Sequence, residues 1–239
     1  MKMWHTTFEE KKDLWDFLQD NNETIFKIVD WCVPRGRLES TKIDAVETEY
    51  KMKEYILKRN QHYYNKDYKG SLVWYNKATD LDRNNFDEWN KKGYAFIKIR
   101  KPKEAIECYT HYLEKHPENP VALNNIAYEL VKIHKAEDAL HFIEKSLEID
   151  NDNAYALDTK GVILGELKRY DESIEYLEKA IKKDPKSYIR WNHKGEVYLK
   201  QEEYEKAIEC FETSLNLKPH YIKAEKNKNY AQKNLKPSE

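Results

Sequence analysis

From residue 86 to residue 221 the sequence repeats itself with a period of 34 residues. Each copy has a large apolar residue, a small residue, a second small residue and a second large apolar residue. In the last copy these are Trp191, Gly195, Ala207 and Phe211. Three of the six glycines and three of the seven prolines fall on only two positions of the period, which chance does not arrange. The chain is therefore built from copies of one supersecondary unit.

Each copy has the pattern of two helices joined by a short polar turn. Trp191, Gly195 and Tyr198 are spaced to share one face of a first helix, and the glycine permits close approach of a neighbouring helix. Ala207 and Phe211 alternate small and large side chains along a second helix, so that the two helices interlock. One helix pair cannot bury its own apolar faces, and the copies must therefore stack into a solenoid.

The arrangement W-x2-L-G-x2-Y, then A-x3-F, then P at a period of 34 residues closely resembles the tetratricopeptide repeat. The resemblance implies an all-α fold, a right-handed α-solenoid of stacked helix-turn-helix repeats with helical N- and C-terminal caps. Four clear repeats, called the first to the fourth repeat below, cover Phe86–Asn119, Pro120–Asn153, Ala154–Ser187 and Tyr188–Tyr221. A divergent repeat is expected at residues 52–85, where Arg59 replaces the usual glycine.

One repeat position departs from the pattern at a junction. Tyr112 occupies a slot that the second, third and fourth repeats fill with Ser146, Ala180 and Ser214. A ring in the place of such small side chains is expected to open or shift the junction between the first and second repeats.

The ends of the chain do not follow the period. Residues 1–51 are predicted to form an N-terminal helical segment, with helices at Thr6–Leu18 and Asn22–Val33 and a third that begins near Ser40 and runs into the divergent repeat. Three of the six tryptophans lie in the first 31 residues. The segment either caps the stack or occupies its groove or docks a partner. Residues 222–239 are predicted to form a C-terminal capping helix and tail.

Composition narrows the classes of function. There are 42 basic and 43 acidic residues, so no net charge draws the chain to nucleic acid or to an anionic membrane. No apolar stretch has the length of a signal peptide or a membrane span. Three cysteines without CxxC spacing indicate a reducing compartment, and we expect a cytoplasmic protein that has no contact with membranes.

The sequence offers no pattern for catalysis or for binding a metal. There is no glycine-rich phosphate loop, no GxSxG and no HExxH. Cys108 and His111 are three residues apart, but no second pair accompanies them. Cys108 and Cys210 share one repeat position but are three repeats apart, too far to hold one ion. We expect no enzymatic activity, no cofactor and no metal site.

The resemblance implies that the first helices of successive repeats line a concave groove through their second, fifth, ninth, twelfth and thirteenth residues. The fifth residues form a column of amides and one carboxylate, whose side chains suit the backbone groups of a peptide. Tyrosines at the ninth position offer flat amphipathic surface, and charged residues of both signs follow. The predicted groove residues are Asn90, Tyr94, Lys98, Asn124, Tyr128, Lys132, Asp158, Asn192, Glu196 and Lys200.

These observations predict a non-catalytic scaffold for protein–protein interaction that binds a peptide or a partner protein in the groove. We expect a monomer or a weak homo-oligomer. One alternative is a regulator or enzyme subunit that acts through residues 1–51 and uses the repeats for targeting. A second is a helical-repeat RNA-binding protein, which would need a basic groove, whereas the predicted groove mixes both signs of charge.

Overall fold

The computed structural model describes residues 40–235 of the chain, and side chains from residue 48 onward. It divides into two compact units, residues 1–57 and 58–239. The boundary lies within helix α3 (Ser40–Tyr64), which begins at the predicted residue and continues into the divergent repeat. The two helices predicted at residues 6–18 and 22–33 lie outside the described residues. In residues 1–57, only the N-terminal part of α3 is described.

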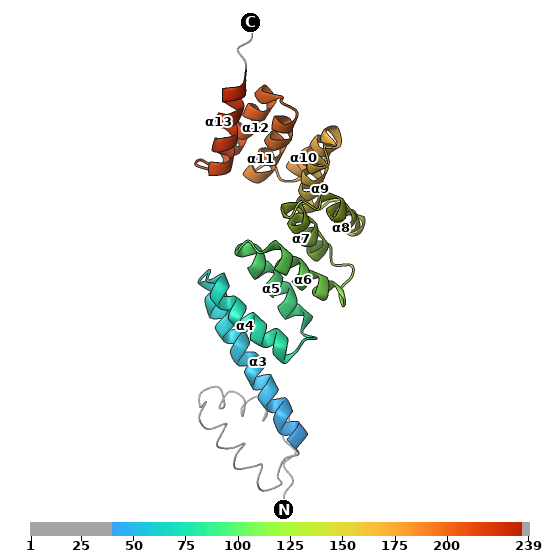
Figure 1. Ribbon diagram of the computed structural model, residues 1–239, viewed down its shortest axis with the longest axis vertical. Helices are drawn as coiled ribbons and strands as arrows, with labels where there is room; N and C mark the ends of the chain where they lie inside the picture. The colour runs from blue at the N-terminus through green and yellow to red at the C-terminus, as the bar shows by residue number, and fades with distance from the viewer. Residues whose placement is uncertain (1–39, 236–239) are drawn as a thin grey trace, which may run out of the picture. The chain divides into compact units, whose positions relative to one another are not determined.

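The second unit consists of helix pairs that follow the predicted repeats (Figure 1). Within residues 40–235 all regular secondary structure is helical, which confirms the all-α solenoid. The first helix of each clear repeat packs against its own second helix, which in turn packs against the first helix of the next repeat. After α3 the helices are α4 (Tyr68–Leu81), α5 (Phe86–Lys98), α6 (Pro102–Leu113), α7 (Pro120–Lys132), α8 (Ala136–Ile149), α9 (Ala154–Glu166), α10 (Tyr170–Lys183), α11 (Tyr188–Lys200), α12 (Tyr204–Leu217) and α13 (Ile222–Asn234).

The turns inside the repeats share one backbone conformation. A single residue in each turn has a φ of 60° to 62°, in the left-handed region, and the next backbone N–H donates to the carbonyl five residues earlier at 2.9 to 3.0 Å. This is the hydrogen bond that closes a helix C-terminus in the Schellman motif. The left-handed residues are spaced by 34 and include one from the divergent repeat: Lys66, Arg100, His134, Lys168 and Glu202. The divergent segment therefore turns as the clear repeats do.

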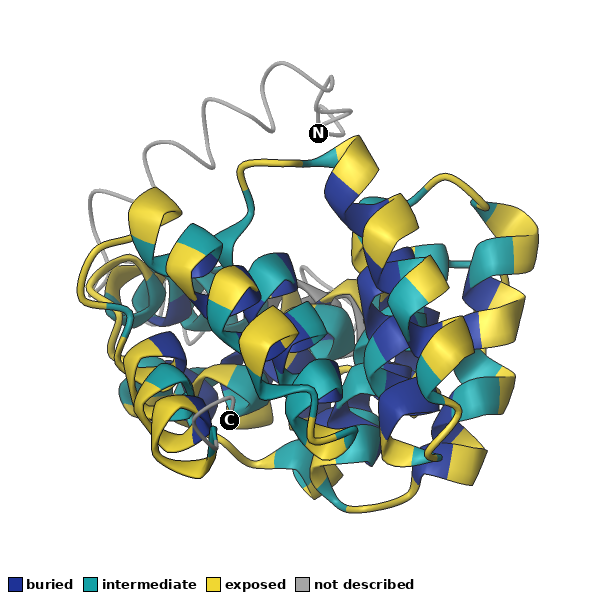
Figure 2. Ribbon diagram, turned by 90° about the horizontal axis from the view of Figure 1, so that it is seen from above, coloured by how far each residue is buried: buried dark blue, intermediate teal, exposed yellow. Residues whose placement is uncertain are grey.

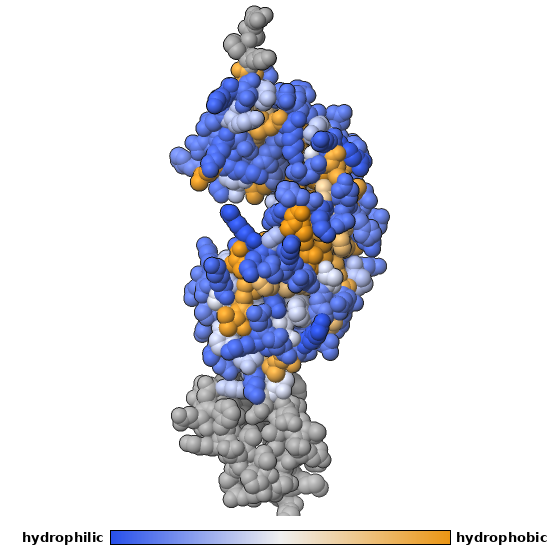
Figure 3. Space-filling view, in the orientation of Figure 1, coloured by the Kyte–Doolittle hydropathy of each residue, from blue (hydrophilic) through white to orange (hydrophobic). Residues whose placement is uncertain are grey.

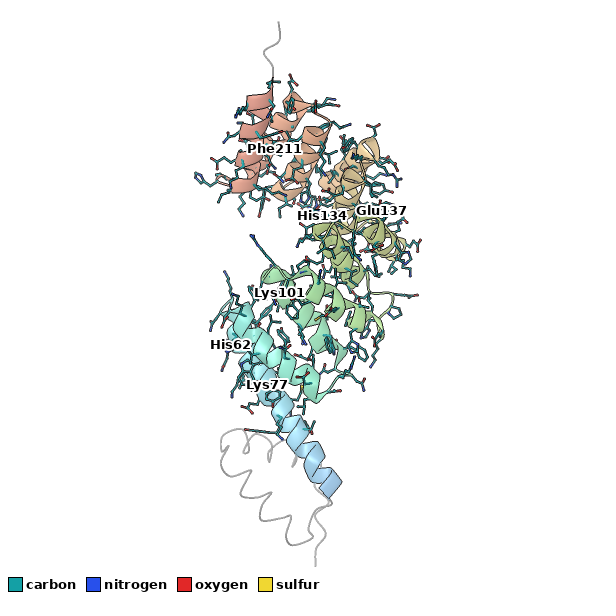
Figure 4. All side chains as sticks on the ribbon, viewed as in Figure 1. His62, Lys77, Lys101, His134, Glu137 and Phe211 are labelled. Atoms are coloured by element: carbon teal, nitrogen blue, oxygen red, sulfur yellow. The ribbon has the colours of Figure 1, made fainter. Side chains whose placement is uncertain are left out.

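Small residues in the first helices let large side chains of the second helices approach closely. A Cβ atom added to Gly195 would lie 2.6 Å from the Phe211 ring, and one added to Gly161 would lie 2.6 Å from Leu177 Cγ. Phe211 is fully buried between α11, α12 and α13 (Figure 4). Figure 2 shows the same division throughout, with buried residues between the helices and exposed residues on their outer sides.

The divergent repeat replaces the glycine contact with a buried arginine. Arg59 is 4% exposed, and its guanidinium lies 5.0 Å from the centre of the Tyr75 ring. Arg59 Nη1 donates to the Tyr75 hydroxyl at 3.4 Å, and Nη2 pairs with Glu88 Oε1 at 3.3 Å. Because a buried charge needs a partner, Glu88 of the first repeat fixes the position of this arginine.

The junction that contains Tyr112 differs from the later ones. The first helices α7, α9, α11 and α13 pack directly on one another in sequence, whereas α5 approaches α7 mainly through α6. The Tyr112 ring is buried against the ring of His116, with centroids 4.7 Å apart, and its hydroxyl accepts from Asn119 Nδ2 at 3.4 Å. The bulky ring of this α6 residue thus packs against the loop between α6 and α7, at the junction where the sequence predicts a shift.

Helix α13 covers the last apolar face of the stack, as predicted for a capping helix. Ala224 and Ala231 are fully buried in a cluster with Ala207 and Phe211. In residues 40–235 no helix is both long enough and apolar enough to cross a bilayer.

Candidate functional site

The predicted groove residues lie on the first helices α5, α7, α9 and α11. Their side chains fall into two groups of different character, one on the first and second repeats and one on the third and fourth. On the face drawn in Figure 3, apolar residues form several patches, over the first and second repeats and over the later ones, on a surface that is mostly hydrophilic.

The first repeat presents an aromatic and cationic cluster. The Tyr94 side chain is 36% exposed, and Lys98 Nζ lies 4.7 Å from the centre of its ring. A hydrogen bond with Tyr94 raises the pKa of Lys98 above its ordinary value, so the ammonium stays charged. The ring of Tyr63, at the end of α3, lies 6.2 Å from that of Tyr94 and 5.5 Å from that of Tyr68. Rings and a cation together suit both apolar and acidic groups of a ligand.

The second repeat carries the same pair one repeat further along, on α7. Lys132 Nζ lies 4.5 Å from the centre of the Tyr128 ring and 2.5 Å from Glu129 Oε1. Burial, followed by the negative charge of Asp158 and of Glu129, raises the pKa of Tyr128 to about 12. Its hydroxyl therefore remains a hydrogen-bond donor at neutral pH.

The column of fifth residues is only partly accessible, which corrects the expectation of a continuous amide ladder. Asn90 and Asn124 are half-buried, but Asp158 is 8% exposed and Asn192 is completely buried. Asp158 is bound by the next repeat, whose His193 Nδ1 lies 3.0 Å from Asp158 Oδ1. The fifth residue of α9 thus faces the sixth residue of α11. At Asp158 and Asn192 the column is therefore buried and not open to a ligand.

The charges predicted for the C-terminal part of the groove are neutralised within the protein. Lys200 Nζ pairs with Glu166 Oε1 at 2.9 Å. Glu196 Oε1 accepts from Lys223 Nζ at 2.7 Å and from Asn227 Nδ2 at 3.0 Å. The capping helix α13 supplies both of these donors. The third and fourth repeats therefore offer a ligand fewer uncompensated charges than their sequence suggests.

The first helices also have an exposed edge that the predicted groove residues do not include. The second residues of the later first helices, Val121, Tyr155 and Ile189, are 57%, 72% and 39% exposed. They recur at the 34-residue period, and that period combined with their apolar character was the signal available in the sequence.

The cysteines of the repeats are not reactive groups. Cys108 and Cys210 are buried, and burial raises the pKa of Cys108 to about 12 and that of Cys210 to about 11. A thiol is nucleophilic only as the thiolate, so these side chains act as small apolar residues.

Comparison with known proteins identifies the repeat. Sequence profiles of the tetratricopeptide repeat match residues 154–187 and 188–221, which are the third and fourth repeats. No curated protein matches the chain significantly in sequence.

Several solved structures have the same fold. YrrB, described as a TPR protein with an unusual peptide-binding site, is 22% identical with a TM-score of 0.57, and the match covers 78% of this chain and 97% of that one. MamA from Desulfovibrio magneticus RS-1 is 19% identical with a TM-score of 0.62, covering 72% and 97%. A thermophilic TPR protein from Thermus thermophilus, TTC0263, is 14% identical with a TM-score of 0.63, covering 76% and 98%.

The stacked helix pairs, the 34-residue period and the turn geometry define an α-helical repeat solenoid. Residues 154–221 match the tetratricopeptide repeat in sequence, and the chain has the fold of TPR proteins. Proteins of this architecture act through extended binding surfaces, and the class of function that the family supports is a scaffold for protein–protein interaction.

Proposed function

We propose that the array binds an extended peptide of a partner protein on the first helices of the first and second repeats. Tyr94, Lys98, Tyr128 and Lys132 would form the main contacts, with Asn90 and Asn124 beside them. The third and fourth repeats would then support this surface without contributing most of its binding energy.

The observation that carries the proposal is the repeated tyrosine–lysine pair. Tyr94–Lys98 and Tyr128–Lys132 occupy the ninth and thirteenth positions of successive repeats, with Nζ to ring-centre distances of 4.7 and 4.5 Å. At the same two positions the third repeat has Val162 and Glu166, and the fourth has Glu196 and Lys200. The charged residues of these later repeats are paired internally, and Lys132 pairs with Glu129, whereas Lys98 has no carboxylate partner among the described residues; Lys98 therefore offers the most available charge.

The chemistry of the pairs favours a peptide with an acidic side chain. Among the described residues no carboxylate pairs with Lys98, so an acidic group of a ligand would gain a charge-assisted contact there. The tyrosine rings offer contact area with little conformational entropy to lose. Asn90 and Asn124 lie beside these pairs and are half-buried, although Asn124 Oδ1 is itself buried and has no hydrogen-bond partner among the described residues.

The fold neighbour YrrB, whose description names a peptide-binding site, supports binding of a peptide as the mode of interaction. The neighbour is only 22% identical, so it supports the mode and gives no indication of the ligand.

A selection of random peptides displayed on phage, with the full-length chain as bait, tests the proposal. We expect enriched peptides that carry Asp or Glu and lose at least roughly tenfold in affinity for a Tyr94→Ala/Lys98→Ala variant, as expected for loss of a central aromatic and charged contact. Val162→Ala/Lys200→Ala alters residues at the ninth and thirteenth positions of the later repeats and serves as the matched control.

Equal loss in both variants would move the site off the N-terminal half of the groove. Binding retained by both variants would place it on another surface altogether. Circular dichroism of each variant establishes that the fold is retained before affinities are compared.

A further inference from the structure

Two tryptophans of the array lie in equivalent sites, which show what an indole requires from this scaffold. Trp89 Nε1 donates to the backbone carbonyl of Arg83 at 3.0 Å. Trp191 Nε1 donates to the backbone carbonyl of Pro185 at 3.2 Å. In both cases the acceptor lies six residues before the tryptophan, in the loop that enters the repeat. A half-buried indole is thus fixed by one N–H donor bond and by the surface around its ring.

The Trp89 site also shows which side chains surround the ring. Lys92 Nζ lies 4.3 Å from the indole centre, and the ring of His111 meets the indole edge-on with centroids 4.6 Å apart. Lys92 comes from the first helix and His111 from the second helix of the same repeat. A cation over the ring face and a second group at its edge complete the site.

The third repeat has leucine in place of the tryptophan, and an open cleft lies beside it. The cleft has a volume of about 470 Å³, within the roughly 300–1,000 Å³ typical of ligand sites. Leu157, Asn151, Lys160 and Lys179 are among its lining residues. By the 34-residue period, these last three correspond in order to Arg83, Lys92 and His111. The cleft therefore has the surroundings of the Trp89 site but no indole of its own.

The aromatic wall of the cleft comes from the second helix. Tyr176 occupies the position that Cys108 and Cys210 have in the repeats with tryptophan. Two cations lie over its ring, with Lys160 Nζ 4.6 Å and Lys179 Nζ 4.8 Å from the ring centre. No described side chain donates to the carbonyl of Asn151, the acceptor that an indole N–H would use.

The second repeat also has leucine at this position but does not repeat the site. The residue that corresponds to Lys160 is Ile126, which is completely buried in the core. The cation that would cover a ring is therefore missing there, and the third repeat alone among the four clear repeats combines the cleft, the cation and the aromatic wall.

We propose that the cleft of the third repeat binds the indole of a tryptophan on a partner polypeptide, whose N–H donates to the Asn151 carbonyl. The molecule itself supplies the argument for this occupant, because equivalent surroundings hold an indole at Trp89. The rim carries exposed groups of both signs that suit the flanking residues of a peptide: Glu148, Glu144, which also pairs with Lys160 at 3.5 Å, and Lys179, which also pairs with Glu175 at 2.6 Å. Tryptophan is enriched among the residues that contribute most of the binding energy at protein interfaces. This site is distinct from the tyrosine–lysine surface and does not depend on it.

Titration of the full-length chain with N-acetyl-tryptophanamide, followed by NMR of labelled leucine methyl groups, tests the proposal. We expect saturable shifts of the Leu157 methyl signals and none with N-acetyl-leucinamide. The 1-methyl analogue of the probe lacks the indole N–H, and we expect it to bind roughly fivefold more weakly because one hydrogen bond is lost. Equal binding of the two probes, or no shift at Leu157, would overturn the proposal.

A variant that fills the cleft from within gives a second test. Leu157→Trp/Tyr176→Cys introduces the tryptophan–cysteine pair that the first and fourth repeats already contain, and we expect it to fold and to lose binding of the probe. Undiminished binding in this folded variant would refute the site. Stronger probe binding after replacement of Trp4, Trp15 and Trp31 by phenylalanine would show that the chain itself fills the cleft and would refute a partner tryptophan.

Discussion

The outer repeats, first and fourth, and the inner repeats, second and third, have different side chains at three equivalent positions of the helix contact. The outer repeats have Trp at the fourth position, Cys at the twenty-third and an aromatic ring at the twenty-fourth. The inner repeats have Leu, then an aromatic ring, then an aliphatic residue at these positions. In chain order the three residues are Trp89, Cys108 and Tyr109; Leu123, Phe142 and Ile143; Leu157, Tyr176 and Leu177; and Trp191, Cys210 and Phe211.

The comparison shows that the total side-chain volume at these three positions stays similar between repeats although the residue types differ. A large ring on the first helix accompanies a small thiol on the second, and a smaller leucine accompanies a second-helix ring. Cores tolerate such exchanges when total volume and pattern are kept. The surface is changed nonetheless, because the inner arrangement moves a ring to a position where it borders solvent. The proposed indole cleft is a consequence of this exchange in the third repeat.

The largest effect is expected where the two helices of an inner repeat touch most closely. Gly161→Leu places a side chain where even a Cβ atom would lie 2.6 Å from Leu177 Cγ. We expect a loss of about 3 kcal/mol in the free energy of unfolding, from overpacking. Urea denaturation measures the loss. The control is Gly165→Ala, whose Cβ would lie 3.2 Å from Val197 Cγ2 and 3.3 Å from Ser173 Oγ; a change below about 1 kcal/mol is expected there. Unchanged stability of Gly161→Leu would show that the helix contact is wrongly assigned.

Replacing two outer-repeat residues by their inner-repeat counterparts tests whether the side-chain volumes at positions 191 and 210 compensate each other. Trp191→Leu removes the indole and its bond to the Pro185 carbonyl, and we expect a loss of about 2 kcal/mol. Adding Cys210→Tyr should recover about half of that loss. A double-mutant cycle by chemical denaturation measures the coupling. Additive losses would mean that the two positions do not compensate each other.

The sequence predicted the parts of the fold that repeat. The period placed the helix pairs, and α3 begins at Ser40 as expected. The contact between Gly161 and Leu177 followed from the alternation of small and large residues. These features depend on residues within one repeat, so local pattern was sufficient to find them.

The features that escaped prediction depend on neighbouring repeats or on backbone conformation. His134 adopts a left-handed φ of 60° although it is not glycine, because the turn closes the preceding helix with a hydrogen bond. Asp158 was predicted to face a ligand but binds His193, which is 35 residues away in the sequence. Glu196 was predicted to give the groove charge but is neutralised by α13. Composition cannot reveal such pairs, because they depend on how successive first helices align.

The Asp158–His193 pair joins the inner third repeat to the outer fourth repeat. It should make the free energy of unfolding depend on pH. Burial lowers the pKa of His193, but the carboxylate of Asp158 raises it by more, with Glu196 adding to the rise and Lys223 opposing it; the net pKa lies above 6.5. A raised pKa contributes stability that is fully present below the unfolded value, about 6.5, and that is lost as the pH rises through the folded value.

Denaturation midpoints across the pH range from about 5 to 9 measure this contribution, because the histidine changes charge within that range. We expect the wild-type chain to lose stability above pH 6.5 relative to Asp158→Asn, which lacks the carboxylate. His141→Gln, a change on the exposed side of α8, is the matched control and should leave the slope as it is. A wild-type stability that rises relative to Asp158→Asn above pH 6.5 would contradict the assigned ion pair.

The smallest effect concerns a hydrogen bond that forms in the same way within one inner repeat and within one outer repeat. Ser146 Oγ donates to the Pro120 carbonyl at 2.8 Å, and Ser214 Oγ donates to the Tyr188 carbonyl at 2.7 Å. The third repeat has Ala180 at this position and forms no such bond. Ser214→Ala should therefore lower the free energy of unfolding by about 1 kcal/mol, measured by denaturation. Ser146→Ala should lose as much, since this bond does not depend on whether a repeat has the tryptophan or the leucine arrangement. A loss confined to one of the two would show that the outer and inner repeats differ in their helix contacts as well as in their side-chain volumes.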